Sequence, residues 1–173
     1  LKGHDLSGVV FDPASVGPRG SSATPGKGSL ITYDMIATID AEWFVRNVTK
    51  VFDAAAAAAG EEFHRGMDAF KVLVNEIGVP DLEKREMFRG VFDGRYKLVR
   101  YFGMGNYHLP TSVQQLLADN DVALYDLQSD PEEMDNLANP AHPRYDEALL
   151  SAMNQKLNAL IAEEIGDDQA MFT

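Results

Sequence analysis

The sequence predicts an α+β fold in which a small antiparallel β-sheet packs against a long C-terminal helix and a helical insert joins the first strand to the others. Alternating apolar runs flank Asp93-Gly94, which predicts a β-hairpin because a type I′ turn needs positive φ at both central residues. A third strand-like run covers residues 122–127, and apolar residues recur at helical spacing after Pro143. Strands and a helix with one apolar side each predict a two-layer core.

The N-terminal residues 1–28 are rich in glycine, proline and serine, which predicts a loop-rich connector. Residues 29–39 then alternate, with Ile31 and Tyr33 on one side, so we expect a strand there. The chain starts without an initiator methionine. We therefore expect a mature or excised fragment, in which residues 1–28 lead from a missing domain and residues 29–173 form one subdomain.

The helical insert is expected over about residues 40–87. Asp40 is a typical N-cap, and apolar residues follow it at helical spacing as far as Gly60. A second helix is predicted for residues 61–77, with an aromatic and aliphatic stripe typical of a core, and Gly78 should end it.

Within the predicted sheet, bulky residues lie on both faces of strand 96–102. After the strand at 122–127, Asp130 can cap a turn of helix, with Pro131 at its first position and Glu133 reaching back as in a capping box. The terminal helix has a continuous apolar stripe, and we expect its acidic C-terminal end to fray because the helix dipole disfavours anions there. The residues of that stripe are Tyr145, Leu149, Met153, Leu157, Leu160, Ile161 and Ile165.

Composition excludes several classes of protein. A formal net charge of −12 argues against a nucleic-acid binder, which needs clustered lysine and arginine. The absence of cysteine excludes disulfides and thiolate metal sites. No apolar run reaches the roughly 18 residues that a membrane-spanning helix needs.

One long motif carries a family resemblance. It runs "Arg-x-x-x-x-Gly-Arg-Tyr-Lys-Leu-Val-x-Tyr", then "Leu-Tyr-Asp-Leu-x-x-Asp-Pro-x-Glu-x-x-Asn-Leu-Ala", and it resembles the C-terminal subdomain of the sulfatase family, the arylsulfatase-like branch of the alkaline phosphatase superfamily. The opening Leu1-Lys-Gly-His-Asp-Leu6 is similar to the segment where such enzymes leave the catalytic domain. The matching residues are Arg89, Gly94, Arg95, Tyr96, Lys97, Leu98, Val99, Tyr101, Leu124, Tyr125, Asp126, Leu127, Asp130, Pro131, Glu133, Asn136, Leu137 and Ala138.

The resemblance implies the C-terminal portion of a sulfuric ester hydrolase, which walls the substrate cleft, stabilises a catalytic domain and is inactive alone. The family's formylglycine nucleophile arises within Cys/Ser-x-Pro-x-Arg, and its calcium site uses Asp and Asn. The chain lacks that motif. No catalytic, cofactor-binding or metal residue is therefore assigned to it, and calcium and formylglycine are expected only in the missing domain.

The candidate substrate contacts lie in the polar segment 103–120, which we expect to be a loop at the mouth of the cleft. They are His108, Asn106 and Tyr107. Arg95, Lys97 and Arg100 form a local basic cluster that could hold an anionic ester, although the charged rim of a strand is favoured.

Two alternatives remain open. The same subdomain could serve a phosphonate monoester or phosphodiester hydrolase. The chain could instead be a non-catalytic interaction module that uses the insert to bind a protein partner. A severed subdomain should also expose the apolar face that meets its catalytic domain, so self-association is expected.

Overall fold

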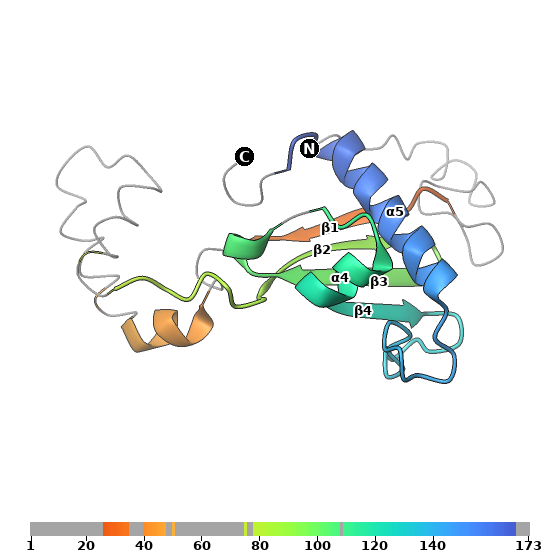
Figure 1. Cartoon of the computed structure of the whole chain (residues 1–173), viewed down its shortest axis with the longest axis horizontal. Helices are drawn as coiled ribbons and strands as arrows, with labels where there is room; N and C mark the ends of the chain where they lie inside the picture. The colour runs from red at the N-terminus through yellow and green to blue at the C-terminus, as the bar shows by residue number, and fades with distance from the viewer. Residues whose placement is uncertain are drawn as a thin grey trace, which may run out of the picture.

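The computed structural model describes residues 26–34, 40–47, 50, 75, 78–107 and 109–168. Four strands form one antiparallel sheet in the order β1-β2-β3-β4 (Figure 1). Their bounds are β1 Ser29–Tyr33, β2 Met87–Phe92, β3 Tyr96–Phe102 and β4 Asp121–Asp126. The predicted α+β fold is confirmed. Within the expected strand at 29–39, β1 ends at Tyr33, and residues 35–39 lie outside the described part.

The β2–β3 hairpin forms where Asp93-Gly94 predicted it. Gly94 has a φ of 104°, which few residues other than glycine adopt. The Asp93 carboxylate accepts hydrogen bonds from the backbone N–H groups of Arg95 and Tyr96 at 3.0 and 2.8 Å. It also accepts one from Lys156 on the terminal helix at 2.7 Å, so the turn is fixed to the helix layer as well as to the sheet.

The terminal helix α5 (Glu147–Glu164) crosses one face of the sheet (Figure 1). Asp146 caps it by accepting from the N–H groups of Ala148 and Leu149. The predicted apolar stripe is buried or partly buried against the sheet, and α5 buries Leu150 in addition. The core cluster between the two layers consists of Val91, Leu98, Leu116, Leu124, Leu137, Ala138, Leu150, Met153, Leu157, Leu160 and Ile161.

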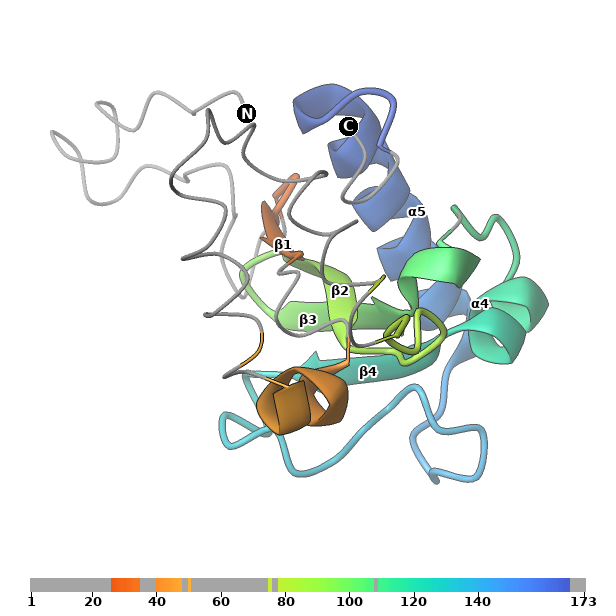
Figure 2. The same ribbon diagram turned by 90° about the vertical axis from the view of Figure 1, so that its left-hand side faces the viewer.

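A second helix, α4 (Val113–Asp119), lies beside α5 on the same face of the sheet (Figure 2). The expectation of a loop throughout 103–120 is therefore wrong for these residues. Ser112 caps α4 by accepting a hydrogen bond from the Gln115 N–H at 3.1 Å. Leu116 on α4 is fully buried, so the helix is stabilised by tertiary packing as well as by its cap.

The expectation that the acidic end of α5 frays stays a prediction. Gly166 turns the chain with a φ of 90°, and Asp168 is buried against the sheet. The ion pair of Asp168 with Arg89 on β2 joins this segment to the sheet.

In the insert, Asp40 caps the helical residues 41–47 by accepting from the Trp43 N–H at 3.1 Å, as predicted. Gly78 has a φ of 86°, typical of a residue just past a helix end. Most of the two predicted insert helices lies outside the described residues, as do residues 1–25 of the expected connector.

Candidate functional site

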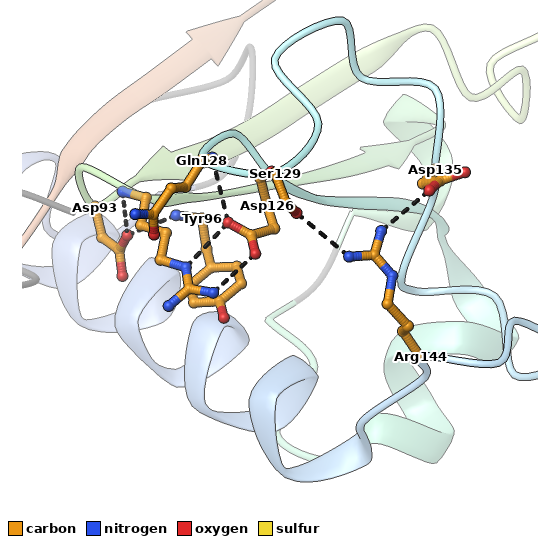
Figure 3. Close-up of polar contacts among 8 residues, drawn as sticks. Asp93, Tyr96, Asp126, Gln128, Ser129, Asp135 and Arg144 are labelled. Atoms are coloured by element: carbon orange, nitrogen blue, oxygen red, sulfur yellow. Dashed lines mark hydrogen bonds and ion pairs between the residues drawn. The ribbon is translucent and has the colours of Figure 1, made fainter. Parts of the chain in front are cut away.

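The turn after β4 is held by a bidentate ion pair. Arg95 donates through Nε and Nη2 to the two oxygens of Asp126 at 3.0 and 2.8 Å (Figure 3). The hydrogen bond from Arg95 outweighs the effect of burial and lowers the pKa of Asp126 below its usual range. Arg144, just before α5, donates to Ser129 at 3.3 Å and to Asp135 at 3.0 Å, which ties the following loop to the start of the helix.

The return segment 130–138 uses its polar side chains to hold the backbone. Asp130 accepts from the N–H groups of Met134 and Asp135 at 3.1 and 2.8 Å. The predicted capped turn of helix is wrong, because residues 131–132 form a simple turn. The side chain of Glu133, a residue with a φ of 57°, accepts from Lys97 at 2.8 Å, while its backbone N–H donates to the Asp130 carbonyl at 3.2 Å.

Asn136 joins this segment to β4. Its side-chain oxygen accepts from the N–H groups of Leu124 and Ala138, both at 3.0 Å, and its amide donates to the Val122 carbonyl at 2.9 Å. The Asn136 side chain therefore satisfies backbone groups of β4 that a neighbouring strand would otherwise bind. The aspartates, glutamate and asparagine of the long motif thus have structural partners.

A second polar cluster is buried under the end of α5. Arg89 on β2 is 1% exposed and donates through Nε and Nη2 to Asp168 at 2.8 and 3.0 Å. Its Nη1 donates to Asp34 at 2.6 Å. Burial alone would lower the pKa of Arg89, but the two carboxylates outweigh that effect and raise it above its ordinary value.

Tyr107 closes this cluster from the loop side. Its hydroxyl donates to Asp168, and its ring packs on Phe102 with centroids 4.7 Å apart. The Arg89 guanidinium lies 5.4 Å from the Phe102 ring centroid and 5.6 Å from that of Tyr107. Burial and the Asp168 carboxylate raise the pKa of Tyr107 above its usual value. The hydroxyl of Tyr107 therefore has a structural partner.

Arg100 on β3 lies directly opposite Arg89 in the sheet and is fully buried. Its Nη1 donates to the side-chain oxygens of Asn154 and Asn158 on α5 at 3.0 and 2.9 Å. Within the described part of the chain, its Nε and Nη2 have no hydrogen-bond partner. Burial lowers the pKa of Arg100 to about 10.

The loop after β3 is fixed above Arg100 by the same two asparagines. Their amide groups donate to the Pro110 carbonyl at 2.8 and 2.9 Å. Of the predicted substrate contacts, Tyr107 thus lies beside the arginines. Asn106 is the last residue of the 3-10 helix η2 (Met104–Asn106), but its side chain is not described. His108 lies outside the described residues.

The predicted basic cluster is divided by the fold. Arg95 lies in the hairpin turn and pairs with Asp126, Lys97 pairs with Glu133, and Arg100 faces α5 in the core. Arg100 is therefore no part of a charged rim. The sequence contains a signal for this buried position, because Arg100 alternates with Leu98 and Phe102 on one face of the strand.

A separate hollow of ≈ 270 Å³ lies at the insert, where Asp40, Trp43 and Lys84 line it with three further polar residues of helix 41–47. Hydrogen bonding from Lys84 outweighs burial and lowers the pKa of Asp40 to about 2. The Asp40 carboxylate also accepts from the Asp81 N–H at 3.0 Å. It therefore fastens the insert to the segment that enters β2.

Among the described residues, no group of three or more His, Cys, Asp or Glu side chains has an arrangement that could hold a metal ion. None of the helices in that part of the chain is both long and apolar enough to cross a membrane. No family model, curated protein or solved structure matches the chain.

Proposed function

We propose that this chain is the C-terminal subdomain of a sulfatase-like sulfuric ester hydrolase, a scaffold that supports a catalytic domain and walls its substrate cleft. The observation that carries the proposal is the use of the long motif. Asp126, Asp130 and Asn136 bind Arg95 or backbone groups, so the motif that resembles the sulfatase family is a structural one. A motif used in this way suits a supporting subdomain.

An aromatic surface on the sheet supports the proposal. On the face of the sheet opposite α5, the rings of Tyr33 and Phe88 stack with centroids 5.4 Å apart, and Phe88 meets Tyr101 edge-on at 5.5 Å. All three side chains are partly exposed. A partly exposed aromatic row is typical of a surface that another domain covers.

The reading frame upstream of Leu1 in the source DNA tests the proposal most directly. We expect an open frame that encodes Cys/Ser-x-Pro-x-Arg, the motif that supplies formylglycine in the resembling family. A start codon close to Leu1 would contradict the proposal and favour the interaction module.

Activity and association measurements complement that test. The purified 173-residue chain should not hydrolyse an aryl sulfate with calcium present, and metal-dependent turnover would refute the supporting role. By light scattering it should self-associate at high concentration, and Phe88→Glu should reduce this association. The matched control is Met134→Glu, at a position 80% exposed on the far loop, which should leave association unchanged.

A further inference from the structure

The sheet and its hairpin turn hold three arginines whose guanidinium edges can be compared. Arg89 and Arg95 each bind one aspartate carboxylate in a bidentate pair, in which Nε and Nη2 donate to the two oxygens at N···O distances of 2.8–3.0 Å. Arg100 has the same Nε/Nη2 edge, but both nitrogens are buried and have no hydrogen-bond partner among the residues that the structure describes. Its Nη1 alone is used, by two asparagine oxygens. The edge that binds a carboxylate in the other two arginines is thus left open in the third.

An open edge of this kind is unusual in a folded protein. Buried polar groups are nearly always hydrogen-bonded, and an unpaired donor costs its full desolvation free energy. A buried charge costs more unless a counter-charge compensates it. A hydrogen-bond acceptor at this edge would remove that cost.

The charges that face Arg100 do not supply that partner. From β2, Arg89 repels it, and from α5 the neighbours are the uncharged amides of Asn154 and Asn158. Asp168 attracts it from beyond the end of α5, but both oxygens of that carboxylate accept hydrogen bonds from Arg89. Among the described residues, no carboxylate therefore accepts a hydrogen bond from the Arg100 guanidinium.

We propose that the Nε/Nη2 edge of Arg100 is a binding site for an oxyanion that presents two oxygens, such as a carboxylate, sulfate or phosphate group. The planar fork of arginine matches such a pair of oxygens, and charge-assisted bidentate pairs are among the strongest hydrogen-bonded contacts. The inference rests on the comparison of the three arginines and goes beyond the proposed function, so it stands or falls independently of it.

The site lies at the interface between β3 and α5, close to the point where Asn154 and Asn158 hold the Pro110 carbonyl. Since Arg100 is fully buried, an anion reaches the edge only when this contact opens locally. Exchange between free and bound protein should accordingly be slower than at a surface arginine.

Arginine side-chain NMR on the wild-type 173-residue chain tests the proposal. The Nε–H resonance of Arg100 is assigned from its disappearance in Arg100→Lys, and independently from its proximity to the Asn154 amide protons, so the assignment survives if the variant fails to fold. Sodium sulfate, sodium phosphate and sodium acetate are titrated separately, with sodium chloride keeping the ionic strength constant. Arg89 and Arg95, whose edges are occupied, are internal controls in the same spectrum.

We expect the Arg100 resonance to respond saturably to at least one anion while those of Arg89 and Arg95 stay in place. A response to sulfate or phosphate alone assigns a tetrahedral oxyanion, and a response to acetate alone assigns a carboxylate. No response to any of the three, or an equal response of all three arginines, overturns the proposal and leaves buried water as the partner.

Thermal unfolding gives a second readout. Sulfate stabilises most proteins by exclusion from their surface, so the comparison is between variants. Arg100→Lys keeps the charge but lacks the fork, and it should lose the part of the sulfate-dependent rise in Tm that exceeds the general effect. Arg144→Gln, which removes a half-exposed arginine, should retain it. Equal rises in the two variants and the wild type would contradict a specific site.

Discussion

Replacement of Arg89 by methionine is expected to destabilise the protein by about 3–5 kcal/mol, the usual cost of removing one partner from a buried ion pair. The guanidinium and the Asp168 carboxylate are 2% and 1% exposed, so water cannot take over the lost hydrogen bonds. Methionine restores much of the apolar contact with Phe102 but none of the three carboxylate hydrogen bonds made at 2.6–3.0 Å. The C-terminal segment that follows α5 should detach first.

Urea denaturation followed by far-UV circular dichroism measures this loss. With a slope of roughly 1–3 kcal/mol per molar urea, the midpoint should fall by at least about 1 M. The double variant Arg89→Met/Asp168→Leu should be more stable than Arg89→Met alone, because an apolar pair often replaces a buried ion pair at little cost.

The matched control is Arg85→Met. Arg85 pairs with Asp121 at 2.6 Å, but the two side chains are 33% and 68% exposed, so the loss should stay within about 1 kcal/mol. If Arg89→Met cost no more than Arg85→Met, the buried cluster would not be stabilising the end of the fold and the reasoning would be refuted.

Three further predictions concern other parts of the molecule. Asn136→Ala should cost about 2–3 kcal/mol in urea denaturation, because it leaves buried backbone groups of β4 without partners; a loss below about 0.5 kcal/mol would show that water replaces the side chain. Asp40 has a folded pKa of about 2, below its ordinary 3.8, so its pairing with Lys84 stabilises the protein above about pH 4 and this contribution is lost as the pH falls towards 2. The difference in unfolding free energy between wild type and Asp40→Asn should shrink over that window, and a constant difference would argue against the pairing. Gly103→Ala would place a Cβ 2.5 Å from the Glu83 carbonyl oxygen, so we expect a clear fall in Tm. The control is Gly105→Ala, whose added Cβ comes no closer than 3.8 Å to Leu82, and an equal fall in Tm for the two variants would contradict the steric argument.

The sequence determined the β2–β3 hairpin, strand β4 and the terminal helix. Local sequence patterns are sufficient to predict these elements. Asp93-Gly94 favours a tight hairpin turn, alternation of residues defines the two faces of β3, and a regular apolar stripe defines α5. The sequence also contained the signal for α4, since Ser112 with Gln115 three residues later matches a capping box. That helix is short and lies in a polar segment, so its pattern resembles that of a loop.

Only the tertiary structure decided how the charged residues are used. Arg95, Lys97 and Arg100 are neighbours in sequence, but the pleat and the turn send them to three different partners. Asp130 and Glu133 match a helix start in sequence, yet Lys97 on the adjacent strand binds Glu133 and the backbone turns instead of coiling. Long-range ion pairs of this kind join residues tens of positions apart, so no local pattern encodes them. The sequence likewise does not show that the Nε/Nη2 edges of Arg89 and Arg95 bind carboxylates while that of Arg100 binds none among the described residues.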